Sequence, residues 1–170
     1  MRILSRLARR RKIAYFLEPL PKDARILEIG SGPGWVGEYL RGNGWNDYMS
    51  LDLIGPADVV GDIRHWQDLG LERASFDVII AFEVVEHVDC FEVCHALLKD
   101  HGRLLLTTPV PHMDWLLTML EWAGLNQTRT SPHNHLVYLK RVSWSGPKQV
   151  TTIAGLSQWA VFTKQDRHDG

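Results

Sequence analysis

Three glycines at alternate positions, Gly30, Gly32 and Gly34, could form a turn that holds a nucleotide-like ligand. They follow a short apolar run at residues 25–29, which reads as a buried strand, and a helix is expected to begin at Trp35. Glycine adopts positive φ readily and places no Cβ between the backbone and a ligand. The first N–H groups of the helix would face the same turn. We therefore expect a nucleotide-like ligand here.

Acidic side chains follow several other expected strands. Asp52 lies near the end of the second strand, Asp62 follows the third and Glu83 follows the fourth. In an open parallel sheet the ligand lies in the crevice beyond the carboxyl ends of the strands. These three acids are therefore candidates for contacts with the ligand of the glycine turn.

Glu28 is the most informative residue of the first strand. A carboxylate in a buried strand is costly unless it is paired; a pyrophosphate would repel it, whereas a ligand ammonium would satisfy it. A G-x-G-x-x-G pattern at residues 32–37 is similar to the dinucleotide fingerprint. However, the strand ends at Ile29, so the first turn glycine is Gly30 and the third dinucleotide glycine would fall at Trp35. The buried acid Glu28, and a tryptophan where the third dinucleotide glycine would fall, argue against a dinucleotide as the ligand.

The elements that must position these residues alternate along the chain between strands and helices. Expected strands lie at residues 25–29, 46–53, 57–60, 76–82, 103–108, 150–153 and 158–163. Expected helices lie at residues 1–20, 35–41, 88–99 and 114–123. This alternation predicts a doubly wound α/β fold, a parallel sheet with helices on both faces, and the closing pair of strands suggests one antiparallel strand at an edge.

Length and composition bound the function. The chain has 170 residues and a formal net charge of −1, which suits one domain and gives no reason to expect nucleic acid as a partner. The only cysteines, Cys90 and Cys94, are spaced as buried thiols on one helix face, so a reducing cytoplasm is expected. No apolar run is long enough to span a bilayer, and no signal peptide is evident.

The expected helix at residues 1–20 carries apolar residues at helical spacing and arginines on its other face. One interpretation is a lid helix that packs on the domain and leaves a solvated basic face. A contact with a membrane surface or an acidic partner is the alternative.

The motifs, taken in order, resemble those of class I S-adenosylmethionine-dependent methyltransferases. Residues 27–34, LEIGSGPG, resemble motif I of that family, and Gly61-Asp62-Ile63 resembles its adenine segment. Residues 76–88 resemble the fourth-strand signature of the small-molecule branch, and residues 98–109 the fifth strand with its turn. The resemblance covers residues 26–111 and implies a Rossmann-like seven-stranded sheet with the last strand antiparallel.

The resemblance also implies roles for single residues. Glu28 would orient or indirectly hold the amino group of the cofactor, and the glycines would let the backbone reach its carboxylate and sugar. Asp52 would bind the ribose, and Asp62 and Ile63 would meet the adenine. The expected cofactor-binding set is Glu28, Gly30, Gly32, Gly34, Asp52, Asp62, Ile63 and Glu83. We expect a single domain over residues 1–170: a basic helix at 1–20, a cofactor-binding core at 25–111, and an acceptor-side segment with the last two strands at 112–170.

Glu83, Glu86 and His87 form an E-x-x-E-H pattern that resembles one in ubiquinone-pathway O-methyltransferases, where such residues can hold a divalent cation. Two carboxylates and an imidazole are plausible metal ligands. A pocket-lining or a structural role is the alternative, and we do not include a metal in the expected site. His87 is the expected catalytic base.

Methyl transfer from a sulfonium needs proximity and alignment, and it needs a base only when the acceptor must lose a proton. The expected function is thus transfer of a methyl group from S-adenosylmethionine to an unidentified small-molecule acceptor. Residues 139–144 leave little room for the acceptor helix of the family, so the pocket could be shallow or completed by a partner subunit, as in a homodimer. A catalytically silent binding module of the same fold and a nicotinamide-dependent oxidoreductase are the alternatives.

Overall fold

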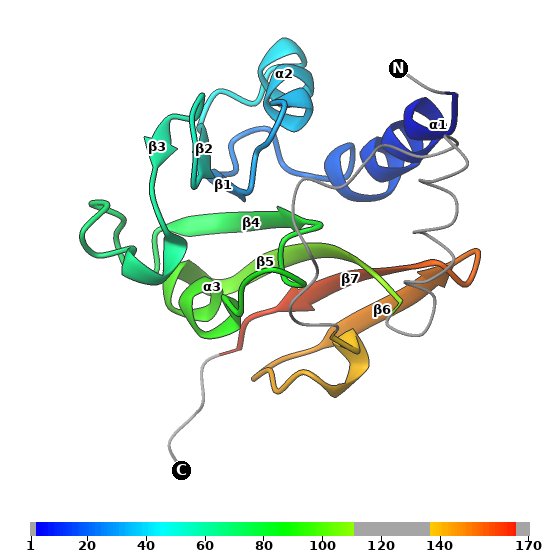
Figure 1. The fold of residues 1–170 in the computed structure, drawn as a ribbon. Helices are drawn as coiled ribbons and strands as arrows, with labels where there is room; N and C mark the ends of the chain where they lie inside the picture. Colours follow the sequence, from blue (N-terminus) through cyan, green and yellow to red (C-terminus); the bar gives the residue numbers. More distant parts are fainter. Residues whose placement is uncertain (1–2, 111–136, 166–170) are drawn as a thin grey trace.

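A seven-stranded sheet forms the centre of the computed structural model, which describes residues 3–110 and 137–165 (Figure 1). The strand order is β3-β2-β1-β4-β5-β7-β6. The strands are β1 (Ile26–Ile29), β2 (Tyr48–Asp52), β3 (Val59–Val60), β4 (Phe76–Phe82), β5 (Leu98–Pro109), β6 (Lys148–Ile153) and β7 (Ser157–Thr163). Strands β1 to β5 pair in parallel, whereas β7 is antiparallel to both β5 and β6. The predicted α/β class and the antiparallel last strand are confirmed.

The antiparallel strand lies one place in from the edge at which it was predicted. β7 lies between β5 and β6, so the edge of the sheet is β6. The two strands form a hairpin through the turn at residues 154–156, and the hairpin inserts its second strand next to β5. A hairpin fixes that its strands are antiparallel to each other, but not which of them pairs with the rest of the sheet.

The helical elements are short. They are α1 (Ile3–Lys12), the π-helix η1 (Ile13–Leu17), α2 (Trp35–Gly42), η2 (Ile63–His65), α3 (Phe91–Leu97) and η4 (Leu139–Arg141). The helix predicted at residues 88–99 is shorter than expected, because Leu98 already pairs with Phe76 as the first residue of β5. The helix predicted at residues 114–123 lies outside the described residues.

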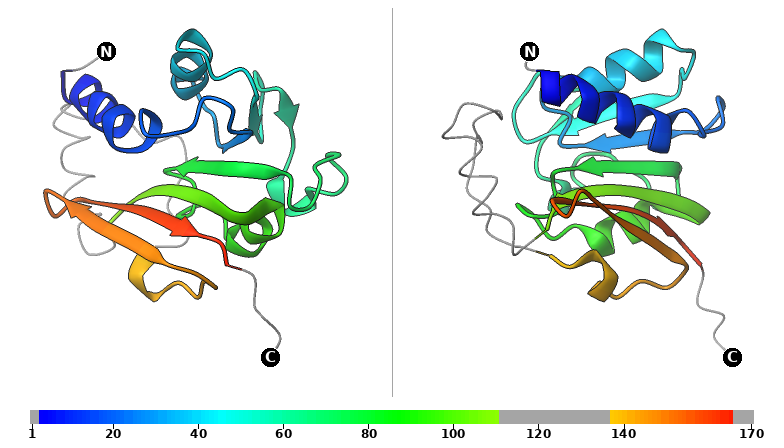
Figure 2. Two further views of the ribbon diagram at one scale, coloured as in Figure 1. Left: turned by 180° about the vertical axis from the view of Figure 1, so that it is seen from behind. Right: turned by 90° about the vertical axis from the view of Figure 1, so that its right-hand side faces the viewer.

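Helices cover both faces of the sheet, as its continuous apolar strands require. The face next to η1 and α2 buries Val78 and Ile80 of β4, and the face next to α3 buries Ile79 and Ala81. This alternation follows from the two-residue period of a strand. Figure 2 shows α1 and α2 next to each other and α3 away from both. Two apolar cores therefore hold the sheet, one on each face.

The strand predicted at residues 46–53 is shorter in the structure, where β2 spans Tyr48–Asp52. Tyr48 and Leu51 are buried and Met49 is half-buried, but Leu53 is 68% exposed. β2 ends at Asp52, so Leu53 already belongs to the turn that follows. Cys90 and Cys94 are buried free thiols, in agreement with the sequence expectation. None of the helices in the described ranges has the length and apolarity needed to cross a membrane.

Gln158 of β7 joins the two described parts of the chain. Its side-chain amide nitrogen donates to the carbonyl of Pro109 at 3.2 Å and to that of Val137 at 2.8 Å. Its amide oxygen accepts from the N–H of Leu139 at 3.0 Å. The side chain is only 4% exposed, so these three bonds satisfy a buried amide. The end of β5 and the residues before η4 are thus fixed next to each other.

Candidate cofactor site

The glycine-rich loop between β1 and α2 adopts the backbone conformation that its sequence predicts. Gly30, Gly32 and Gly34 have φ of +71°, +48° and +74°, in the left-handed region that favours glycine. A Cβ on Gly32 or Gly34 would meet no atom within 4 Å, whereas a Cβ on Gly30 would lie 2.6 Å from Cγ2 of Val84. Gly30 therefore permits packing, while Gly32 and Gly34 face open space.

Asp52 is brought directly to this loop. β2 runs parallel to β1 and ends at Asp52, and the Oδ2 atom of Asp52 accepts a hydrogen bond from the N–H of Gly32 at 2.8 Å. The carboxylate is half-exposed, so it retains accessible lone pairs. Two residues that the sequence predicted for one site, twenty positions apart, are thus in contact.

Glu28 is buried, with only 3% of its surface exposed, and the hydroxyl of Tyr48 donates to its Oε2 atom. Burial raises the pKa of Glu28 to about 7; the Tyr48 hydrogen bond opposes this rise and the nearby Asp52 carboxylate adds to it. Tyr48 is held below α2, because a Cβ on Gly37 would lie 2.8 Å from its hydroxyl oxygen. A tyrosine therefore accounts for the buried acid. The sequence reasoning missed this partner, although an inward-facing tyrosine on the neighbouring expected strand was the signal.

Ser31 is a polar residue of the loop that sequence reasoning did not single out. Its hydroxyl is buried and has no hydrogen-bond partner among the described residues. Buried polar groups are normally paired, and an unpaired one needs an explanation. A polar ligand group at the loop would supply the partner.

Asp62 and Ile63 follow β3, and the N–H of Gly61 donates to the backbone carbonyl of Asp52 at 2.9 Å. The side chain and backbone N–H of Arg64 bond the carboxylate of Asp62, and these bonds lower its pKa to about 2. Ile63 is 3% exposed and packs in the core. The structure thus places this turn next to Asp52, with Asp62 paired to Arg64 and Ile63 buried. Their predicted contacts with adenine stay predictions.

Glu83 lies at the carboxyl end of β4 with a φ of +58°, which is unusual for a residue other than glycine. Its Oε1 atom accepts from Thr107 Oγ1 at 2.8 Å and from Lys12 Nζ at 2.9 Å. Partial burial alone would raise the pKa of Glu83, but the Lys12 charge and these hydrogen bonds hold that pKa below its usual value. Glu83 is therefore an ionised acceptor that ties β4, β5 and α1 together.

Glu86 is 1% exposed and accepts from Thr108 Oγ1 at 3.0 Å. Burial raises its pKa to about 8, and the neighbouring charge of Glu83 acts in the same direction. Glu86 is therefore mostly protonated at neutral pH. His87 is half-buried in the turn that follows β4, where its N–H donates to the carbonyl of Val84 at 2.8 Å. No group of three or more His, Cys, Asp or Glu residues in the described ranges is placed to hold a metal ion.

The N-terminal helix α1 lies over this side of the sheet. Besides the bond to Glu83, Lys12 Nζ donates to Thr107 Oγ1 at 2.9 Å. One turn earlier, the guanidinium of Arg9 lies 5.4 Å from the ring centroid of Trp35, the first residue of α2. The expected helix thus contacts the carboxyl ends of β4 and β5 and the end of the glycine-rich loop. These partners could not be predicted from the sequence, because they depend on where the helix packs.

The mostly parallel sheet and the glycine-rich loop beside an acid on the next strand define a Rossmann-like α/β domain with a site for a nucleotide-like ligand at the carboxyl ends of its strands. A family model described as a methyltransferase domain matches residues 2–144, and the chain belongs to this family. S-adenosylmethionine is the cofactor of this family, as the sequence motifs implied. The finer resemblance to ubiquinone-pathway O-methyltransferases stays a prediction. No curated protein sequence matches the chain significantly.

Solved structures with this fold include phosphoethanolamine N-methyltransferase 2 from Haemonchus contortus in complex with S-adenosyl-L-methionine, at 14% identity and a TM-score of 0.66. They also include the CurJ carbon methyltransferase, at 20% identity and 0.56. A SAM-dependent methyltransferase from Archaeoglobus fulgidus is similar at 16% identity and 0.55.

The alignments cover 94%, 91% and 95% of this chain, and 53%, 52% and 93% of the three neighbours. The chain therefore spans about half the length of the first two. At these identities the likeness shows the fold alone.

Proposed function

We propose that this chain transfers the methyl group of S-adenosylmethionine to a small-molecule acceptor by in-line displacement. The observation that carries the proposal is the contact between Asp52 and the N–H of Gly32, beside the open side of Gly32 and Gly34. It joins a hydrogen-bond acceptor to a loop whose Gly32 and Gly34 carry no side chains, at the carboxyl ends of β1 and β2. Ligands of open α/β sheets bind at this edge.

The residues present fit the cofactor. Ser31 offers an unpaired buried hydroxyl among the described residues, and Gly32 and Gly34 leave the backbone accessible. Asp52 would hold the ribose hydroxyls with its accessible lone pairs. Glu28, Gly30, Asp62, Ile63 and Glu83 complete the proposed binding set, with Glu28 acting from below the loop through Tyr48. When bound, the sulfonium supplies a methyl group that is already activated for displacement.

The remaining task of the chain is to align the acceptor and, for a hydroxyl acceptor, to remove its proton. Glu83 is engaged by Lys12 and Thr107, and Glu86 is mostly protonated at neutral pH. Neither carboxylate is well suited to accept a proton there. His87, in the same turn and half-buried, is the proposed base.

The acceptor is proposed only as a small molecule. The phosphoethanolamine N-methyltransferase and the CurJ carbon methyltransferase differ in the atom that their names assign, although both have this fold. The fold therefore does not choose between nitrogen, oxygen and carbon. We also propose that the chain forms a single domain, that it acts in the cytoplasm and that it could form a homodimer. These three proposals rest on the sequence arguments alone.

Calorimetry with S-adenosylhomocysteine tests the proposal. We expect micromolar binding of S-adenosylhomocysteine and none of NADH by the full chain. Binding of NADH instead would contradict the proposal and favour an oxidoreductase. Transfer of labelled methyl groups from S-adenosylmethionine into a small-molecule cell extract is the second measurement. Tight cofactor binding without transfer to any extract component would favour the catalytically silent module.

A further inference from the structure

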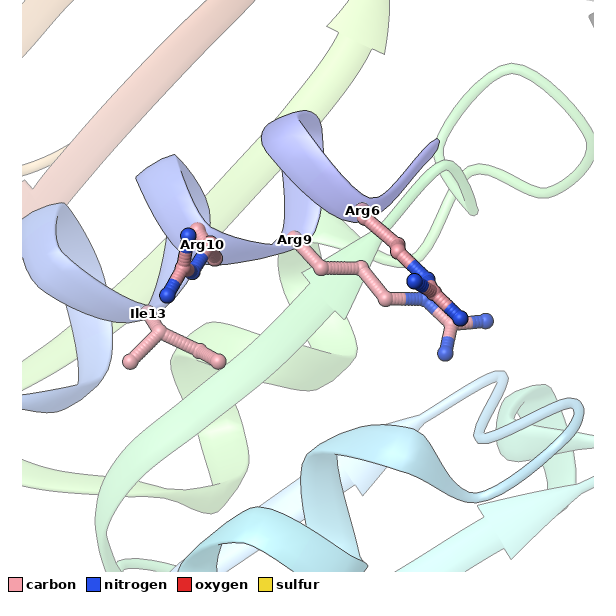
Figure 3. Close-up of a pocket in the computed structure, with 4 residues that line it drawn as sticks. All are labelled: Arg6, Arg9, Arg10 and Ile13. Carbon is pink, nitrogen blue, oxygen red and sulfur yellow. The ribbon is translucent and has the colours of Figure 1, made fainter. Parts of the chain in front are cut away.

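A pocket of about 430 Å³ lies on α1, outside the set of residues assigned to the cofactor. Its described lining residues are Arg6, Arg9, Arg10 and Ile13 (Figure 3). The three arginines are spaced i, i+3 and i+4, so they share one face of the helix. Figure 3 shows Arg6 and Arg9 extending from α1 in the same direction, whereas the side chain of Arg10 lies apart from them, beside Ile13. The pocket therefore combines one apolar side chain with three guanidinium groups.

The positive charge of this pocket is not compensated within the described residues. None of Arg6, Arg9 and Arg10 forms an ion pair there, and α1 has no acidic residue in its first turn. Cations at this spacing repel each other. Lys12, on the same helix, does have an acidic partner in Glu83. An anionic ligand would neutralise the three arginines.

The pocket is also close to the proposed site of methyl transfer. Arg9 lies over Trp35, which directly follows Gly34, and Lys12, three residues further along α1, bonds Glu83 at the end of β4. The ring of Trp35 in turn stacks on Phe82, the last residue of β4, at 6.3 Å between centroids. Arg9 thus lies beside the end of the glycine-rich loop, and Arg6 extends in the same direction as Arg9.

We propose that this pocket binds an anionic group of the methyl acceptor, a phosphate or carboxylate on a small molecule. Guanidinium groups bind both anions through paired N–H donors. One cofactor carboxylate would need a single arginine fork, whereas Arg6 and Arg9, which extend in the same direction, suit a doubly charged phosphate, with Arg10 adding positive charge to the same pocket. The volume lies within the range of small-molecule sites, about 300–1,000 Å³, and exceeds the needs of a bare ion. This inference rests on the proposed function, which it refines.

The half-buried position of Arg9 over Trp35 favours a small anion over a flat anionic surface. Arg6, Arg10 and Arg11 are all exposed, so the vesicle measurement described below separates a small anion from an anionic surface. Arg11 follows Arg10 directly and therefore projects from a different part of the helix. It is exposed and does not line the pocket. Arg11 therefore offers a matched control on the same helix.

The test is binding of inorganic phosphate to the full chain at low ionic strength, followed by calorimetry. We compare the wild type, the double variant R6Q/R10Q and the control R11Q, which all keep Arg9 on Trp35. We expect the double variant to bind phosphate about tenfold more weakly or worse, and R11Q to bind like the wild type. Added sodium chloride should weaken binding to the wild type, since the interaction is electrostatic.

S-adenosylhomocysteine and methylthioadenosine, which lacks the carboxylate, separate the two sources of the anion. We expect both to bind R6Q/R10Q as they bind the wild type. Loss of S-adenosylhomocysteine binding alone would assign the arginines to the cofactor and overturn the inference. Equal phosphate binding by all three proteins, or a dependence on Arg6 and Arg10 seen only with phosphatidylserine vesicles, would also overturn it. Failure of the wild type to bind S-adenosylhomocysteine, with phosphate binding intact, would instead refute the proposed function.

Discussion

Glu28 is a buried acid next to the glycine-rich loop. Its strand is buried on both faces, yet it carries a carboxyl group that Tyr48 bonds from the neighbouring strand. The rise of its pKa to about 7 means that the folded chain binds this proton more tightly than the unfolded chain does. The protonation state of Glu28 therefore changes close to neutral pH, next to Gly30.

The free energy of unfolding should depend on this proton. The contribution of Glu28 is fully present below about pH 4.5 and is lost as the pH rises to about 7. A pKa difference of this size corresponds to about 3 kcal/mol. Urea unfolding at several pH values should show a fall in stability over this range that is smaller by about that amount in Glu28→Gln. Glu86, with a pKa of about 8, contributes a fall of the same sign in both proteins. An identical fall in the two proteins would contradict the prediction.

Asp52 should contribute to cofactor affinity. Asp52→Ala removes both the acceptor for Gly32 N–H and the proposed partner of the ribose hydroxyls. We expect binding of S-adenosylhomocysteine to weaken by about 1–3 kcal/mol, because hydrogen bonds to a charged group are lost. Calorimetry is the measurement, and Asp68→Ala, at an exposed position, is the control. Unchanged affinity would mean that another residue binds the ribose.

Much of the site at this scale could be predicted from the sequence, but the partners of its residues could not. The glycine-rich turn and Asp52 are local features, because each follows directly from the end of a strand. The bonds of Tyr48 to Glu28 and of Lys12 to Glu83 join residues that are 20 and 71 positions apart. Such pairs depend on strand order and helix placement, which local patterns do not contain.

At the scale of elements, a glycine can be required for its backbone conformation or for the space that a side chain would fill, and Gly30 and Gly70 separate these two requirements. Gly30 and Gly70 have nearly the same φ, +71° and +72°, but only at Gly30 would a Cβ contact another side chain, that of Val84. Both substitutions with alanine should cost about 1–2 kcal/mol for the left-handed conformation. Gly30→Ala should cost about 1–3 kcal/mol more because of overpacking. Urea unfolding measures both, and equal losses would show that Val84 moves away freely.

α1 is held on the sheet by Lys12 at its last turn. Lys12→Met should lose the bonds to Glu83 and Thr107 while keeping the apolar stem of the side chain. Because the side chain of Glu83 is 44% exposed, we expect a modest loss of about 1 kcal/mol in the local stability of the helix. Hydrogen exchange of the amides in α1 and η1 should become about fivefold faster. Arg11→Met, on the same helix, should not have this effect.

The elements that were predicted best are those whose signal is entirely local. β4 occupies the predicted residues because its apolar run is continuous and bounded by polar residues. α3 is shorter than its pattern, since pairing of Leu98 with Phe76 extends β5 into the expected helix. Tertiary pairing therefore overrode helical periodicity at that boundary.

For the whole molecule, the order of the strands matters more than their number. Seven strands and an antiparallel last strand could be inferred from the chain, but the insertion of β7 between β5 and β6 could not. That insertion places Gln158 in the interior of the sheet, where it bonds the carbonyls of Pro109 and Val137 and the N–H of Leu139. The side chain of Gln158 thus links the end of β5 to the residues at the start of η4.

Gln158→Leu should destabilise the whole chain, because it leaves three backbone groups without their partner. We expect a loss of about 2–4 kcal/mol in the free energy of unfolding. Gln149→Leu is the control, since Gln149 occupies an exposed position on β6. Thermal or urea unfolding is the measurement. A loss no larger than that of the control would show that water replaces the amide.

The same amide has a consequence for how such a chain could change over time. It fixes the residues at both ends of the segment 111–136 to the sheet, whatever the sequence between them. The entropy of closing a loop grows only slowly with its length. An inserted segment of different length or composition would therefore find the same two anchor points. A lineage of such proteins could therefore vary the length of this segment without rebuilding the sheet to which its ends are attached.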